Sequence, residues 1–95
     1  MADRFASRLR GLLGRRGLAP AEGLLIRPAS SIHTFFMRFP IDVAFLDRDG
    51  VVVKVVPNLS PWRVALARGA RDALELAAGT AATRGLRPGR RLVAR

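Results

Sequence analysis

The stretch that decides the fold is SSIHTFFMRFPIDVAFLDRDG, which runs from Ser30 to Gly50. It holds the only histidine of the chain and four of its five phenylalanines. Residues 41–46 and 51–56 are rich in β-branched and apolar side chains, and the acidic turn between them closes on a glycine that can supply the positive φ of a tight hairpin. The sequence therefore predicts a β-hairpin over these two segments, with Pro57 ending the second strand.

Shorter apolar runs predict strands on the N-terminal side of this hairpin. Residues 24–26 form a run that ends before Pro28, and residues 32–36 form another after a small polar turn. If the alternation of a strand continues past His33, residues 33, 35 and 37 share one face and residues 34, 36 and 38 share the other. Each face then carries an aromatic ring, and we expect a strand that is covered on both sides.

The C-terminal third is more mixed. Residues 57–71 carry turn residues and are predicted to form a loop. Residues 70–78 have the composition of a helix, yet the alternation of Leu74 and Leu76 also suits a strand. A short helix is predicted after Gly79, with Thr80 as its N-cap and Gly85 at its end, followed by a final strand at 91–93.

The total charge and its distribution limit the possible functions. The 95 residues carry a formal charge of +10, but residues 1–20 account for +4 and residues 84–95 for +5, so the central domain is almost neutral.

There is no cysteine, which excludes disulfides, thiolate metal sites and cysteine nucleophiles. No apolar run is long enough to cross a bilayer and no secretory signal is evident, so we expect a cytoplasmic protein.

Residues 1–20 are predicted to form a basic tail. Phe5, Leu9, Leu12 and Leu13 have helical spacing, whereas three glycines in the same stretch weaken a helix. The tail can therefore be partly helical, and residues 1–18 can make peripheral contact with a membrane. Residues 21–95 are expected to form a single β-rich domain.

Several motifs taken together resemble those of domain-of-unknown-function family 192. They are the opening at 23–26, the aromatic-Met-basic element followed by Pro and Asp at 36–43, the turn at 45–50, the Ala-Leu-Glu-Leu strand at 73–76 and the ending at 85–89. The resemblance covers most of residues 23–93. The sequence departs from the family pattern at Ala29, where relatives commonly have Cys, and at Arg90, where they commonly have an acidic residue.

The resemblance implies a mainly β fold: a small compact antiparallel β-barrel or sandwich-like domain with one or two short helices. It also favours a strand over a helix at residues 70–76. The resemblance implies no reaction, cofactor or ligand, because the family has no established activity and fold alone does not define function.

The residue types of a hydrolase triad are present, but not its spacing. Ser31 and His33 would lie on the same face of one strand, with Asp42 as the acid, yet there is no nucleophile elbow and no evident oxyanion loop. A single histidine without cysteine cannot form a structural zinc site, and the acids near the hairpin are explained by turn formation. We expect no catalytic residue, no metal and no cofactor.

The aromatic run invites two interpretations. Phe35, Phe36, Phe39 and Met37 are expected to pack in the core, because burying each such side chain contributes roughly 1.5–3 kcal/mol. The alternative is an exposed apolar rim.

Asp42 interrupts an apolar strand and should have a partner, because an unpaired buried charge is costly. Arg38 and Arg63 are the candidates. The interaction is either a structural ion pair or part of a cleft in which arginine binds a carboxylate or phosphate. Trp62, beside Arg63 in a loop flanked by proline, is the best surface for recognition, although it can also cap the core.

These observations predict a non-enzymatic module that binds a small ligand or a protein partner. The candidate contact residues are His33, Met37, Arg38, Asp42, Trp62 and Arg63. One alternative is a small hydrolase-like enzyme that uses His33. Another is association with nucleic acid or an anionic membrane through the arginine-rich ends of the chain.

Overall fold

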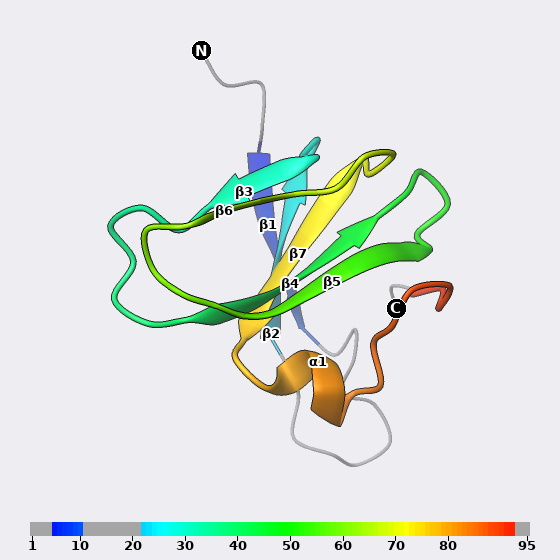
Figure 1. Ribbon diagram of the computed structural model, residues 1–95. Helices are drawn as coiled ribbons and strands as arrows, with labels where there is room; N and C mark the ends of the chain where they lie inside the picture. Colours follow the sequence, from blue (N-terminus) through cyan, green and yellow to red (C-terminus); the bar gives the residue numbers. More distant parts are fainter. Residues whose placement is uncertain (1–4, 11–21, 93–95) are drawn as a thin grey trace.

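The computed structural model describes residues 5–10 and 22–92, and these residues form an antiparallel β structure with one short helix (Figure 1). The elements in chain order are β1 (Phe5–Arg10), β2 (Glu22–Arg27), β3 (Ser31–His33), β4 (Ile41–Leu46), β5 (Val52–Leu59), β6 (Val64–Leu66), β7 (Asp72–Ala77) and α1 (Thr80–Thr83). The prediction of a mainly β domain is confirmed.

The strands form two sheets that face each other. Five strands pair in the order β1-β2-β7-β4-β5, and β3 pairs with β6 in a separate two-stranded ribbon. The ribbon arches over one face of the larger sheet and α1 lies against the other (Figure 1). The barrel is not closed, so the fold is sandwich-like.

Strand β4 is at the centre of the core because it pairs with β5 on one side and β7 on the other. Its six residues are all buried. Val43 and Phe45 face the ribbon, whereas Ala44 and Leu46 face α1. Because side chains alternate along a strand, β4 contributes residues to two hydrophobic clusters, one on each side of the sheet.

The predicted hairpin is confirmed, including its turn chemistry. The Asp47 carboxylate accepts hydrogen bonds from the backbone N–H groups of Asp49 (2.8 Å) and Val51 (3.0 Å), and Gly50 has a φ of 79°. The prediction that Pro57 ends the second strand is wrong, because β5 continues to Leu59. β5 is an edge strand, where the N–H that proline lacks is not needed by a neighbouring strand.

Other boundaries also differ from the predictions. The strand predicted at 32–36 ends at His33, and the segment 57–71 contains β6 as well as loops. The ambiguous segment 70–78 contains β7, as the resemblance favours. Near the C-terminus, Arg91 forms a single bridge to Val51, and residue 93 lies outside the described residues.

The predicted short helix is present, but its N-cap is Gly79 (φ 92°) rather than Thr80. At its other end, the Arg90 guanidinium donates to the carbonyl oxygens of Arg84 and Gly85, both at 3.0 Å. A cation suits this position because carbonyl groups at a helix C-terminus carry partial negative charge.

Part of the predicted N-terminal tail belongs to the sheet. Residues 5–10 form β1, which pairs with β2 along its whole length and is not helical. A short helix interrupted by glycine is marginal in water, whereas pairing with an existing strand satisfies the backbone. The remainder of the tail, residues 1–4 and 11–20, lies outside the described residues. Within the described part of the chain, no helix has the length and apolar character needed to cross a membrane.

Candidate binding surface at the aromatic tip

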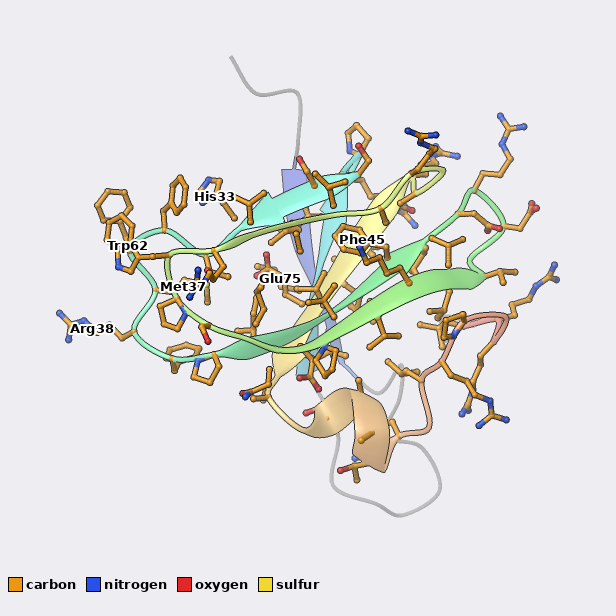
Figure 2. All side chains as sticks on the ribbon, viewed as in Figure 1. His33, Met37, Arg38, Phe45, Trp62 and Glu75 are labelled. Atoms are coloured by element: carbon orange, nitrogen blue, oxygen red, sulfur yellow. The ribbon has the colours of Figure 1, made fainter. Side chains whose placement is uncertain are left out.

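Four ring side chains meet where the β3–β6 ribbon ends, and we call His33, Phe35, Phe36 and Trp62 the aromatic tip. Ring centroids lie 4.6 Å apart for His33 and Phe35, 5.6 Å for the stacked pair Phe35 and Trp62, and 4.7 Å for the edge-to-face pair Phe36 and Trp62. Figure 2 shows His33 and Trp62 at this end of the molecule. Phe36 is 81% exposed and Trp62 58% exposed, so the rings pack on one another with large areas facing solvent.

Thr34 connects the two loops that carry these rings. Its side chain is fully buried, and its hydroxyl donates to the Ser60 carbonyl oxygen (2.6 Å) and accepts from the Arg63 N–H (2.9 Å). Its backbone N–H donates to the Arg63 carbonyl oxygen and its carbonyl oxygen accepts from the Trp62 N–H, both at 2.9 Å. Thr34 therefore fixes the aromatic tip from beneath. The sequence did not reveal this role, because a threonine within an aromatic run fits an ordinary strand.

The backbone at the tip is held in an unfavourable conformation. Phe36 and Trp62 have positive φ angles of 68° and 65°, which non-glycine residues rarely adopt. Such a conformation costs about 1–3 kcal/mol per residue and persists only where the surroundings enforce it. Here the hydrogen bonds of Thr34 do so, and both residues concerned carry rings that are more than half exposed.

The rim of the tip is cationic. Arg38 and Arg63 are exposed, and the stretches 33–40 and 58–64 contain no aspartate or glutamate. Within the described residues, no ion pair is found for either arginine. Both guanidinium groups can therefore meet an anionic partner next to the rings.

An apolar groove of 300 Å³ opens beside the tip, between its 34–40 loop and the larger sheet. It is lined by Gly23, Leu24, Met37, Phe39, Ile41, Glu75, Leu76 and Ala77. Its volume is at the lower end of the range of ligand pockets, which suits a single large side chain or a similar group.

Glu75 is the one ionisable residue in the lining of this groove, and the sequence did not single it out. Its place between Leu74 and Leu76 suggests an outward side chain on a strand with one buried face. The ribbon covers part of that second face, however, so Glu75 is half-buried and lies in the space between the two sheets (Figure 2).

The prediction that the aromatic run packs in the core is wrong for its three phenylalanines. Phe35, Phe36 and Phe39 are exposed, and only Met37 packs against a core cluster. The strand alternation stops at His33 because the chain turns there, and Phe45 from β4 fills the core instead. The alternative interpretation, an exposed apolar rim, describes the structure.

The expected ion pair of Asp42 is also absent. Asp42 is 1% exposed, and its two carboxylate oxygens accept hydrogen bonds from the backbone N–H groups of Asn58 and Ala81, each at 2.8 Å. Arg38 and Arg63 point to solvent. The pairing of β4 with β5 shifts register beside Asp42, and this irregularity together with the start of α1 supplies the two donors. Asp42 thus holds the fold together and is not available to a ligand.

The triad residues are not assembled. Ser31 and His33 lie on the ribbon as neighbours on one face, but His33 Nδ1 accepts a hydrogen bond from the Phe35 N–H (3.3 Å). Asp42 is occupied by backbone donors. Residues 5–10 and 22–92 contain no cluster of acids and histidine that could hold a metal ion.

The fold and this surface define a class of protein: a small open β-sandwich with exposed aromatic rings and two exposed arginines at one end. The chain belongs to the family DUF192, described as "Uncharacterized ACR", which matches residues 1–94. The match includes the first 22 residues, which the sequence motifs alone left outside.

Individual relatives agree with this assignment. UPF0127 protein PH1112 of Pyrococcus horikoshii is 42% identical over 67 residues, which is 67% of this chain and 57% of that protein. UPF0127 protein PYRAB11210 of Pyrococcus abyssi is 39% identical over 70 residues and is matched over 56% of its length. The chain therefore spans little more than half the length of these relatives.

A solved structure resembles the fold. A protein of unknown function from Novosphingobium aromaticivorans superimposes with a TM-score of 0.70 at 27% identity, over 87% of this chain and 64% of that one. These likenesses establish the family and support the fold, and none of the names carries an activity.

Proposed function

We propose that this domain is a non-enzymatic binding module that recognises an acidic segment of a partner protein through the aromatic tip. The observation that carries the proposal is the set of exposed, mutually packed rings held rigidly by Thr34. Aromatic side chains that are fixed before binding lose little conformational entropy on contact, and Trp and Arg are the residues that most often dominate binding energy.

The chemistry of the surface supports a particular kind of partner. Arg38 and Arg63 flank the rings, so carboxylates on the partner would form charge-assisted hydrogen bonds there. The adjacent groove would take one large apolar side chain between Met37 and Phe39. The recognised segment therefore combines a bulky apolar residue with neighbouring aspartates or glutamates.

The hydrolase-like alternative has less support. His33 Nδ1 is engaged by a neighbouring N–H, and the Asp42 carboxylate is buried among backbone donors, so the two cannot form an acid–base pair as they stand. The alternative that uses the arginine-rich ends stays a prediction, because part of each end, residues 1–4, 11–20 and 93–95, lies outside the described residues.

A random-peptide display library tests the proposal directly. Peptides selected on the immobilised wild-type domain should share a large apolar residue flanked by acids. They should lose binding to the W62S variant and to the R38E/R63E double variant, because these remove the stacking surface and reverse the rim charge.

The control is Arg87→Glu, which reverses the charge of one exposed arginine near the C-terminus. It should bind the selected peptides as the wild type does. Equal binding by W62S and wild type, with circular dichroism showing both folded, would reject the aromatic tip as the binding surface. Enrichment of basic peptides would reject the acidic partner.

A further inference from the structure

The outer face of the β3–β6 ribbon, which is turned away from the larger sheet, carries apolar side chains where the solvent side of an antiparallel sheet is ordinarily polar. Ile32 and Ala65 point inward and are buried in the core cluster beneath the ribbon. Because side chains alternate along a strand, their neighbours point outward, and there Val64 is 57% and Leu66 59% exposed. The described fold therefore leaves an apolar face uncovered.

This outer face continues into the aromatic tip as two parallel rows of side chains. Ser31 pairs with Leu66 and His33 pairs with Val64 across the ribbon, and the stacked rings of the aromatic tip extend both rows. Every large apolar side chain that is exposed within the described residues belongs to this face, the tip or the groove. Exposed apolar side chains that gather in this way mark a contact surface for a partner.

The charged residues beside the outer face are cationic. Arg63 lies at the tip end, Arg68 follows Leu66 at the other end, and both are exposed. Lys54 reaches across from β5, where its ammonium group donates to the Leu66 carbonyl oxygen (2.8 Å). Residues 30–40 and 58–71, which contain the ribbon and its loops, include no aspartate or glutamate. Two copies of this face would repel each other, so the face suits an acidic partner and not a second copy of the chain.

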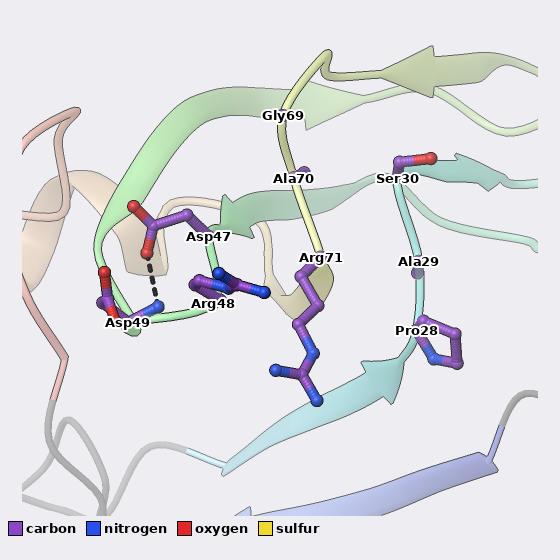
Figure 3. Close-up of a pocket in the computed structure, with 9 residues that line it drawn as sticks. All are labelled: Pro28, Ala29, Ser30, Asp47, Arg48, Asp49, Gly69, Ala70 and Arg71. Atoms are coloured by element: carbon purple, nitrogen blue, oxygen red, sulfur yellow. Dashed lines mark hydrogen bonds between the residues drawn. The ribbon is translucent and has the colours of Figure 1, made fainter.

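The acids of the β4–β5 turn lie beyond the end of the ribbon that is away from the tip. Asp47 and Asp49 line an open depression there, together with Arg48 and Arg71 (Figure 3). Two acids and two arginines leave this depression without net formal charge, so it does not offset the cations beside the outer face.

The two rows suit an amphipathic helix better than an extended strand. A helix satisfies its own backbone groups and presents an apolar stripe about 100° wide, which is broad enough to meet both rows. An extended segment takes its main-chain hydrogen bonds from an open sheet edge, and on the β6 edge the Leu66 carbonyl oxygen is already bonded to Lys54. At about 3.3 Å per residue, the row from Trp62 to Leu66 is about 13 Å long, which is the length of about nine helical residues.

We propose that the acidic segment recognised at the aromatic tip binds as an amphipathic α-helix along the outer face of the ribbon. This inference rests on the proposed function and extends the contact surface from the tip to Val64 and Leu66. The apolar stripe of the helix covers the two rows, and its carboxylates face Arg63, Lys54 and Arg68. A helix of this length is marginal in water, so the segment folds as it binds.

Two synthetic peptides of identical length and composition test the conformation. In one, Leu and Phe recur at the helical positions i, i+3, i+4 and i+7 with Glu elsewhere, and in the other the same apolar residues alternate strictly with Glu. The helical-pattern peptide should bind about tenfold or more tightly in calorimetry, and the circular dichroism of the mixture should show a gain of helix. Equal or tighter binding by the alternating peptide, or binding without a gain of helix, would overturn the helical conformation.

The V64T/L66T double variant tests the surface. Both side chains are exposed and threonine suits a strand, so the variant should have the circular dichroism of the wild type. Its affinity for the helical-pattern peptide should be about tenfold lower, because the apolar contact along the ribbon is reduced. The control Ala82→Ser makes an exposed residue of α1 more polar and should leave the affinity unchanged.

The outcomes separate this inference from the proposed function. If V64T/L66T binds the peptide as the wild type does while W62S does not, the aromatic tip remains the contact surface and the inference is overturned. It is also overturned, with the proposed function intact, if peptides selected on the domain bind at the tip but the helical-pattern peptide does not bind. Binding to phosphatidylserine vesicles without binding to the peptide would assign the face to a membrane surface. Self-association that is lost in V64T/L66T would assign it to a second copy, and either result contradicts the inference.

Discussion

Buried polar residues and exposed rings lie almost side by side in this chain, and they have opposite roles. Thr34 and Asp42 are buried and use their side-chain oxygens on backbone donors or acceptors. Phe36 and Trp62 are large and apolar, yet they face solvent. The polar pair therefore belongs to the architecture, whereas the rings are not required by the core.

The largest expected effect on stability is that of replacing the buried phenylalanine, Phe45. Phe45 is completely buried between the sheets, so Phe45→Ala should lower the free energy of unfolding by about 3–5 kcal/mol. Urea denaturation followed by circular dichroism measures this loss. A loss below about 1 kcal/mol would mean that β4 is not the centre of the core.

Asp42→Ala should be almost as damaging. It removes two charge-assisted hydrogen bonds and leaves the N–H groups of Asn58 and Ala81 without their acceptor, so we expect a loss of about 3 kcal/mol or more. Asp42→Asn keeps one acceptor oxygen and should fall between this variant and the wild type in the same urea experiment. If Arg38→Ala proved as destabilising as Asp42→Ala, the main partner of Asp42 would be Arg38 and not the two backbone N–H groups.

Thr34→Val should have a moderate effect on stability and a visible effect on the tip. The substitution keeps the shape but deprives the Ser60 carbonyl and the Arg63 N–H of their partner, at a cost of about 1–3 kcal/mol. Thr34→Ser retains the hydroxyl and should lose less. The Trp62 emission should also change in Thr34→Val, and an unaltered spectrum would show that Thr34 does not position the rings.

The smallest expected effect is that of Phe36→Gly on stability. Glycine adopts the φ of 68° without strain, which offsets the loss of the edge-to-face contact with Trp62, worth about 0.5–1.5 kcal/mol. The free energy of unfolding should therefore stay within about 1 kcal/mol of the wild type, while peptide binding falls. A loss as large as that of Phe45→Ala would place Phe36 in the core and contradict the comparison.

The sequence predicted the parts of the fold that depend on local chemistry. The β4–β5 hairpin followed from its β-branched and apolar strands and from the Asp-Arg-Asp-Gly turn, since both act over a few residues. The exposure of Phe35 and Phe36 could not be predicted from the sequence. The strand β3 ends at His33, so the alternation assumed for these two residues does not continue. Where a strand stops depends on its partner β6, which is more than 30 residues away in the sequence.

The candidate site was predicted only in part, because local sequence identifies some of its residues but not the distant elements that surround them. His33, Arg38, Trp62 and Arg63 belong to the tip or its rim, and Met37 lines the groove. Asp42 was assigned a charged partner because its backbone donors come from β5 and α1, which no local pattern brings together. Glu75 and Thr34 were missed because only the second sheet and the paired loops give them their surroundings.

The most direct test of the central claim is the fluorescence of Trp62, the only tryptophan of the chain. In the wild-type domain alone, its emission should be that of a solvent-exposed indole and should be readily quenched by acrylamide. Titration with a peptide selected on the domain should shift the emission to shorter wavelength and protect it from quenching, in proportion to the bound fraction measured by calorimetry. Binding measured by calorimetry with no change in Trp62 emission or quenching would show that the aromatic tip is not the contact surface.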